Sequence, residues 1–172
     1  MIDISTRILY SNSNIKDRAT RRVLIPNPGE GKRGQQGHIG YLLRQANSAH
    51  RIRMEQALAD LEITLPQFSV LTMLAAYPGA SGADLARLSL LTPQTMSVIV
   101  ANLERAGAVS RYPDAVHGRI QHIEVTKVGR QLLSKCRTRV KTLEEDLLVG
   151  VTQTDERVIR RWLVQVALHN PK

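Results

Sequence analysis

Apolar residues recur every three or four positions in six segments of the chain, a pattern typical of helices that bury one face. Between the fourth and fifth segments the pattern changes to two short β-type runs, at 109–112 and 120–125. Capping or turn-forming residues separate the segments, and the predicted helices cover residues 39–61, 64–77, 81–88, 92–106, 126–149 and 152–170. We therefore expect a mainly α fold that contains one β-hairpin.

The third and fourth predicted helices are short and lie close together in the sequence. Ser81 is followed three positions later by Asp84, an arrangement that satisfies backbone N–H groups at the start of a helix. Thr92 takes the same role for the next helix, and Pro93 occupies its first turn without losing a hydrogen bond. Gly107 is placed to end that helix in a left-handed conformation. The pattern predicts a helix-turn-helix, whose second helix can enter the major groove of DNA.

The β-hairpin that follows carries turn formers and hydrogen-bond donors. Asp114 and Gly118 favour a turn, and Arg111, His117 and Arg119 are expected to place donors around its tip. Beside a helix-turn-helix, such a hairpin is a wing that contacts phosphates or the minor groove. The alternative is an ordinary surface hairpin of a small α+β domain. The order helix, turn, helix, hairpin favours the wing, and thus an α+β winged-helix fold.

The residues predicted to contact duplex DNA lie on the caps of the two helices, on the outer face of the second helix or on the hairpin. They are Ser81, Thr92, Pro93, Gln94, Thr95, Ser97, Val98, Asn102, Arg105, Arg111, His117 and Arg119.

Longer motifs around this region resemble one known family. The runs LPQFSVLTML and SGADLARLSLLTPQTMSVIVANLERAGAVSRYPDAVHGRIQHIEVTKVGRQLL are similar to those of MarR (multiple antibiotic resistance regulator) winged-helix transcription factors. The resemblance covers residues 38 to 169. It implies a dimeric regulator that binds a palindromic operator, acts as a repressor and is released by a small aromatic or lipophilic ligand.

The chain departs from the family pattern at two places. His117, Gly118 and Arg119 stand at the wing tip, where family members usually have an acidic residue and two arginines. Val98 and Asn102 stand in the second helix, where arginines are common. The resemblance therefore implies an operator contacted less by arginine–guanine pairs and more by short polar side chains of this helix.

Composition agrees with an anionic partner. The chain has 172 residues, a formal net charge of +9 and a sequence pI near 10.3. Aromatic residues make up only 3% of it, too few for a platform on which single-stranded bases stack, so duplex DNA is the expected partner. With one cysteine and no signal peptide or long apolar span, we expect a cytoplasmic protein without a disulfide or a membrane partner.

The chain divides into an arm and a domain. Residues 1–37 are rich in Pro, Gly and basic residues, which predicts a flexible or loosely packed arm, and residues 38–172 form the domain. Within that domain the winged helix-turn-helix is expected at about 64–125, and dimerisation helices at about 38–61 and 126–170. The alternative is that these helices cover their own monomer's core. The proposed dimer contacts are Leu143, Leu147, Trp162 and Val166.

A few side chains suggest further roles. His50 interrupts the apolar stripe of the first helix, so it either makes a buried structural hydrogen bond or contacts an acidic effector. By helix position, the candidate effector residues are Tyr41, His50, Met54 and Phe68. Cys136 lies on an apolar stripe, which favours an inert thiol over a redox sensor.

Catalytic and metal-binding motifs are not found in the sequence. No nucleophile elbow, phosphate-binding glycine loop or metalloprotease motif is present, and the five histidines lack metal-ligand spacing, so we expect no enzyme, metal or cofactor. The competing hypothesis is a winged helix used for protein–protein contact without ligand sensing, because a fold does not fix a function. Salt-dependent, sequence-specific binding to a duplex would separate the two.

Overall fold

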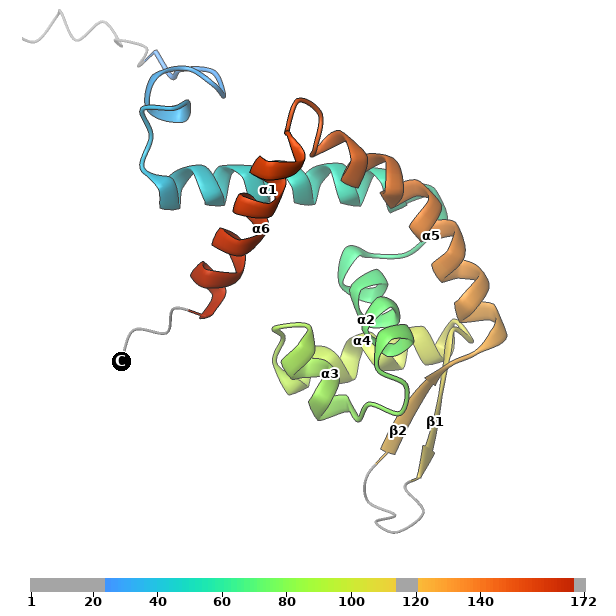
Figure 1. The fold of residues 1–172 in the computed structure, drawn as a ribbon. Helices are drawn as coiled ribbons and strands as arrows, with labels where there is room; N and C mark the ends of the chain where they lie inside the picture. Colours follow the sequence, from blue (N-terminus) through green and yellow to red (C-terminus); the bar gives the residue numbers. More distant parts are fainter. Residues whose placement is uncertain (1–23, 114–120, 169–172) are drawn as a thin grey trace, which may run out of the picture. The chain divides into compact units, whose positions relative to one another are not determined.

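The computed structural model describes residues 24–113 and 121–168. In these ranges the chain is helical apart from one hairpin (Figure 1). The elements, in chain order, are η1 (Gly31–Arg33), α1 (Ile39–Leu58), η2 (Ala59–Leu61), α2 (Leu65–Ala76), α3 (Gly82–Leu88), α4 (Pro93–Arg105), β1 (Val109–Pro113), β2 (Gln121–Val125), α5 (Lys127–Asp146) and α6 (Gln153–Leu168). The predicted mainly α fold with a two-stranded hairpin is confirmed.

The chain separates into two compact units, Met1–Gln45 and Ala46–Lys172, with the boundary inside α1. In the first unit, Arg33 fastens the segment before α1 to the helix. Its Nε donates to the Gln45 side chain at 3.2 Å, and the Gln45 amide donates back to the Arg33 carbonyl at 3.0 Å. Arg33 also donates to the carbonyl of Pro26 at 2.9 Å. Arg33 therefore links the end of the predicted arm to α1.

The second unit has a single apolar core that joins the helix-turn-helix, the hairpin and α5. The most deeply buried side chains come from five helices and include Leu58, Val70, Leu71, Leu85, Met96, Leu103 and Cys136. Side-chain caps begin α2 and α3 as the sequence predicts. Thr64 with Gln67, and Ser81 with Asp84, form capping boxes, in which two backbone N–H groups are satisfied reciprocally.

Helix α5 contacts the hairpin and the end of α4 through a glycine. Thr126 caps α5, and its hydroxyl also donates to the Gly107 carbonyl at 2.6 Å. Gly129 is buried one turn later, and a Cβ built on it would lie 2.0 Å from the carbonyl oxygen of Ala108. Only a residue without a side chain permits this approach.

The stripe of α5 covers the core of its own chain. Leu133, Cys136 and Val140 are all buried in that core. Burial also raises the pKa of the Cys136 thiol, which disfavours the reactive thiolate. This part of the α5 stripe therefore packs in its own chain's core. In α6, by contrast, no residue is buried.

Two sequence predictions need correction. The helix that starts at Thr126 ends at Asp146 and not near Val149, because a turn with left-handed Gly150 follows it. The helical spacing of Leu85 and Leu88 in the sequence predicts that both face inward, but Leu88 is 38% exposed while Leu85 is fully buried. Helix α3 is only two turns long, so its last residue lies beyond the core.

Within the described residues, no single helix has the length and apolar composition to cross a membrane. Only the bent pair 39–61 and 65–76 meets that test, by length and composition alone.

Candidate nucleic-acid interface

The helix-turn-helix consists of α3 and α4, joined by a turn of four residues. At its start the hydroxyl of Ser81 accepts from the Asp84 N–H at 3.2 Å, while Asp84 accepts from the Ser81 N–H at 3.0 Å. The Ser81 hydroxyl also donates to the Asp84 carboxylate at 2.6 Å. This bond, followed by the one from the Ser81 N–H and by the Arg87 charge, holds the pKa of the Asp84 carboxyl below its usual range. Thr92 caps α4 by accepting from the Thr95 N–H at 3.2 Å. The predicted caps of both helices are thus confirmed.

The face of α4 opposite the core is exposed and nearly uncharged. Gln94, Val98 and Asn102 follow one another at helical spacing, and the Val98 side chain is 61% exposed. Asn102 accepts from Arg105 at 3.0 Å, while the Gln94 amide makes no hydrogen bond within the described residues. Ser97 donates to the Pro93 carbonyl, and Thr95 bonds Thr92 through their hydroxyls. Gln94 and Val98 are therefore the residues most available to a partner.

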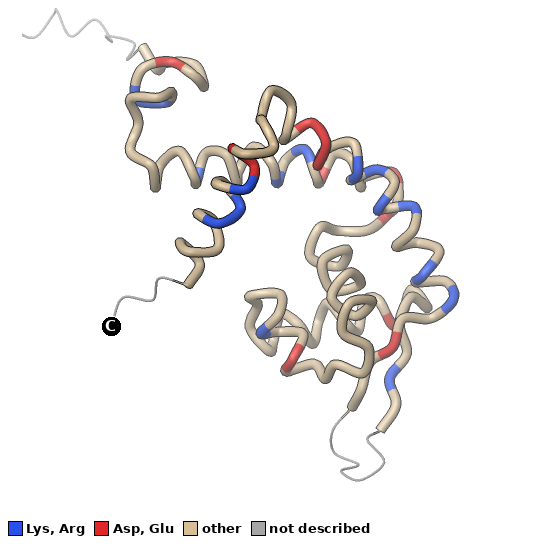
Figure 2. Tube along the Cα trace, viewed as in Figure 1, with Lys and Arg blue, Asp and Glu red and all other residues tan. Residues whose placement is uncertain are grey.

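Charge lies elsewhere in the second unit. The charged residues of α4 are Glu104 and Arg105, both at its C-terminal end. Figure 2 shows α4 almost entirely without charge, while lysines and arginines follow α5 and α6. A duplex docked on α4 would therefore meet hydrogen-bonding and apolar side chains in the groove, and its phosphates would need cations from other elements.

The hairpin pairs β1 and β2 antiparallel, with Arg111 opposite Ile123. Arg111 was expected to place a donor near the hairpin tip, and in the structure it lies within β1. Its guanidinium contacts the Glu104 carboxylate of α4 at 3.1 Å, so it holds the strand to the recognition helix. His122 of β2 donates to the Gly79 carbonyl before α3, which ties the other strand to the helix-turn-helix. His117 and Arg119, the other predicted wing contacts, lie outside the described residues.

The turn between α3 and α4 contains a strained leucine. Leu90 has φ of +55° and is 93% exposed, whereas the neighbouring Ser89 has a buried hydroxyl without a hydrogen-bond partner in the described structure. A left-handed conformation costs a non-glycine residue about 1–2 kcal/mol. Because the Leu90 side chain is exposed, its burial does not offset this cost. No sequence pattern marks Leu90, since the strain is a property of the turn backbone.

Leu90→Gly is expected to raise the free energy of unfolding by about 1 kcal/mol, because glycine adopts positive φ without steric cost. Leu88→Gly, at the end of α3, is the matched control and is expected to lower stability. Urea unfolding of the three proteins measures both effects. Equal destabilisation by the two variants would contradict the strain at Leu90.

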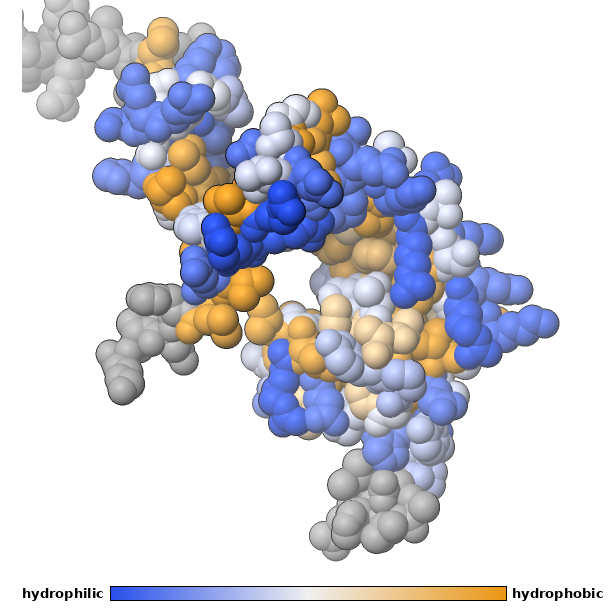
Figure 3. Space-filling model, viewed as in Figure 1, coloured by the Kyte–Doolittle hydropathy of each residue, from blue (hydrophilic) through white to orange (hydrophobic). Residues whose placement is uncertain are grey.

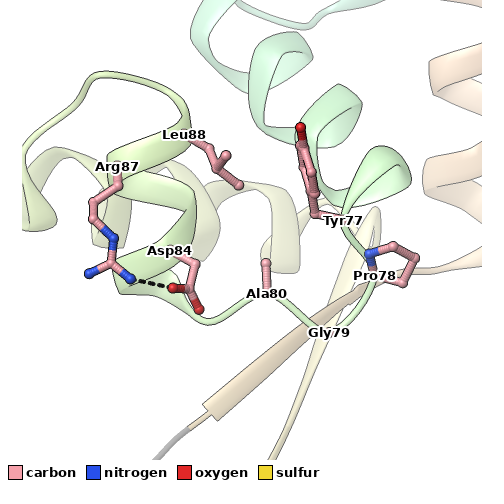
Figure 4. A pocket seen from close by; sticks show the side chains of 7 residues that line it. All are labelled: Tyr77, Pro78, Gly79, Ala80, Asp84, Arg87 and Leu88. Carbon is pink, nitrogen blue, oxygen red and sulfur yellow. Dashed lines mark hydrogen bonds and ion pairs between the residues drawn. The ribbon is translucent and has the colours of Figure 1, made fainter.

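An open cavity of about 470 Å³ adjoins the helix-turn-helix (Figure 4). Tyr77 and Leu88 supply its apolar walls, and the paired Asp84 and Arg87 lie at one side. In the sequence Asp84 is recognisable only as a capping residue. The hollow forms because the chain between α2 and α3 turns sharply at left-handed Gly79.

The four candidate effector residues differ in their surroundings. Met54 is buried in the core of the second unit, Phe68 packs against that core, and His50 is partly buried. Tyr41, in the first unit, lines a cavity of about 340 Å³ together with Lys32, Arg33 and His38. The basic pair Lys32–Arg33 just before the first helix was the available sequence signal for this cavity. An effector role for the four residues remains a prediction.

The four candidate dimer residues also differ. Leu143 packs against the core of its own chain, and Leu147 is 47% exposed. Trp162 and Val166 of α6 are 37% and 41% exposed. Figure 3 shows apolar side chains gathered along part of α6.

Among the described residues, no group of three His, Cys, Asp or Glu side chains could hold a metal ion.

A capped two-helix motif whose second helix exposes its outer face, followed by a hairpin tied to that helix, defines the winged helix-turn-helix class of DNA-binding proteins. The sequence model of the MarR family matches residues 61–120. The chain is 36% identical over 125 residues to the HTH-type transcriptional repressor Rv2887 of Mycobacterium tuberculosis, a match that covers 73% of this chain and 90% of the relative. The chain belongs to the MarR family and is a DNA-binding transcriptional regulator, not an enzyme.

Solved structures agree with this assignment. Rv2887 in complex with salicylic acid has a TM-score of 0.60 and 34% identity, and the match covers 77% of this chain and 98% of that one. The complex of S. aureus MepR with DNA has a TM-score of 0.71 and 25% identity, with 76% and 96% covered. The winged-helix prediction is therefore confirmed.

Proposed function

We propose that this protein is a cytoplasmic homodimeric repressor that binds a palindromic operator and is released by a small aromatic acid. The observation that carries the proposal is the outer face of α4, on which Gln94 and Val98 are exposed and not engaged by the protein's own polar groups. A glutamine amide can form two hydrogen bonds with adenine in the major groove. The relatives named as repressors, and the MepR complex with DNA, support this reading.

The dimer is supported by α6. Its exposed apolar residues include Trp162, Val164 and Leu168, whose exposure is 37%, 57% and 76%. An exposed apolar helix face is unfavourable in a monomer. A second copy related by two-fold symmetry would cover this face, and it would place the two recognition helices about one turn of DNA apart.

The ligand class is supported by two observations. Rv2887 has been crystallised with salicylic acid and with p-aminosalicylic acid. In this chain the cavity at Tyr41 combines an aromatic ring with the cationic side chains of Lys32 and Arg33 and with His38. An aromatic carboxylate matches both, because its ring can pack on the tyrosine while its charge meets the cations.

The experiment is a fluorescence anisotropy titration of the purified protein against its own upstream region and a scrambled duplex, at two salt concentrations. Gln94→Ala is expected to cost about 1–3 kcal/mol on the operator and little on the scrambled duplex. Gln131→Ala, an exposed glutamine on α5, is the matched control and should change neither. Salicylate should release the wild type, and Tyr41→Ala should raise the concentration required.

If the wild type does not distinguish the operator from the scrambled duplex, the repressor proposal fails. The winged domain would then be a protein–protein module, the competing interpretation of the sequence.

A further inference from the structure

The middle of the recognition helix α4 exposes an apolar side chain where a polar one is expected. Val98 is 61% exposed, whereas the apolar residues on the core face of the same helix are at most 8% exposed. A β-branched residue also lowers helix propensity slightly. The folded chain therefore gains little from a valine here, and a contact with a partner would explain it.

The neighbours of Val98 identify the kind of contact. Gln94 lies one turn before it and Asn102 one turn after it, so that the three side chains form a row along the outer face. Both neighbours carry side-chain amides, which can form two hydrogen bonds with the edge of adenine. A valine between two amides can pack only against an apolar group on the base edges. In the major groove only thymine provides one, its C5-methyl group.

We propose that Val98 contacts the C5-methyl group of a thymine in each operator half-site and makes that position specific for thymine. The inference rests on the proposed function, since it assigns a base to the helix that would enter the groove. A valine cannot donate to O6 and N7 of guanine, and it would leave the cytosine N4 amine without a partner if it excluded water there. Both effects disfavour a G·C pair at this position.

The contact can be tested by removing one methyl group from the DNA. Uracil differs from thymine only by the missing C5-methyl group and keeps the Watson–Crick pairing. Each thymine of the footprinted operator is replaced by uracil, symmetrically in both half-sites, and the dissociation constant is measured for the wild type and for Val98→Ala. Alanine favours the helix at this exposed position, so the variant is expected to fold normally.

At one position, uracil should weaken wild-type binding about fourfold for each half-site, as expected for one lost methyl contact. The same replacement should have almost no effect on Val98→Ala. Val128→Ala, which changes a valine of α5 that is 54% exposed, is the matched control and should keep the wild-type sensitivity. Replacing the sensitive T·A pair by C·G should weaken binding, and 5-methylcytosine should restore part of it.

The proposal is overturned if the wild type binds its operator specifically but no thymine is sensitive to uracil, or if Val98→Ala keeps the sensitivity. In both cases the proposed function stands. Failure of the wild type to discriminate the operator from scrambled DNA would instead remove both.

Discussion

Gly129→Ala is expected to lower the free energy of unfolding by about 3 kcal/mol, the upper end of the usual cost of overpacking. An added Cβ would lie 2.0 Å from the Ala108 oxygen and 2.9 Å from a methyl group of Val125. The carbonyl cannot simply move away, because it accepts from the Thr126 N–H at 3.0 Å. Helix α5 would have to shift against the core that Leu133 and Cys136 complete.

Thermal unfolding followed by circular dichroism measures this effect. For a chain of this size, the loss corresponds to a fall in Tm of about 6–12 °C. Gly40→Ala is the matched control, because no atom lies within 4 Å of the added Cβ. In that helical position alanine is expected to stabilise the protein by about 0.5–1 kcal/mol. A Gly129→Ala protein as stable as the wild type would show that α5 does not dock this closely.

A second large effect is expected from Trp162→Glu combined with Val166→Glu. Both residues belong to the exposed apolar surface of α6, and neither is buried by its own chain. Two carboxylates there should prevent the dimer without unfolding the monomer. Because a dimer binds two half-sites through one linked unit, its loss should weaken operator binding about 10²–10⁴-fold.

Light scattering after gel filtration gives the mass of each variant, and anisotropy gives its affinity for the operator. Gln165→Glu adds the same carboxylate to an exposed polar position of α6 and should leave both unchanged. A double variant that remains a dimer would place the interface elsewhere. A monomer that keeps wild-type affinity would mean that dimerisation is not needed for operator binding.

The two cavities differ in the charged groups that line them. Pairing of Asp84 with Arg87 beside Tyr77 forms one hollow next to the helix-turn-helix, and Arg33 shapes another beside Tyr41. Of these two cavities, the second combines an aromatic ring with cations that are not paired with a carboxylate in the described structure. For this reason we propose it as the site of the aromatic acid.

The sequence alone determined the boundaries of most elements and the class of fold. Ser81, Thr92 and Thr126 begin helices through bonds to N–H groups three residues away, and Gly107 ends one through its own backbone freedom. These interactions are local, so residue type and spacing are enough to predict them. The apolar period of α4 likewise fixed which of its faces is exposed.

Tertiary structure decided the features that depend on residues distant in the sequence. Arg111 was predicted at the wing tip, yet it pairs with Glu104, which approaches it only when β1 folds back along α4. The apolar stripes of α5 and α6 look alike in the sequence, but one enters the core of its own chain and the other is exposed. A periodic pattern shows that a face will be buried, and only the packing of the whole chain determines what buries it.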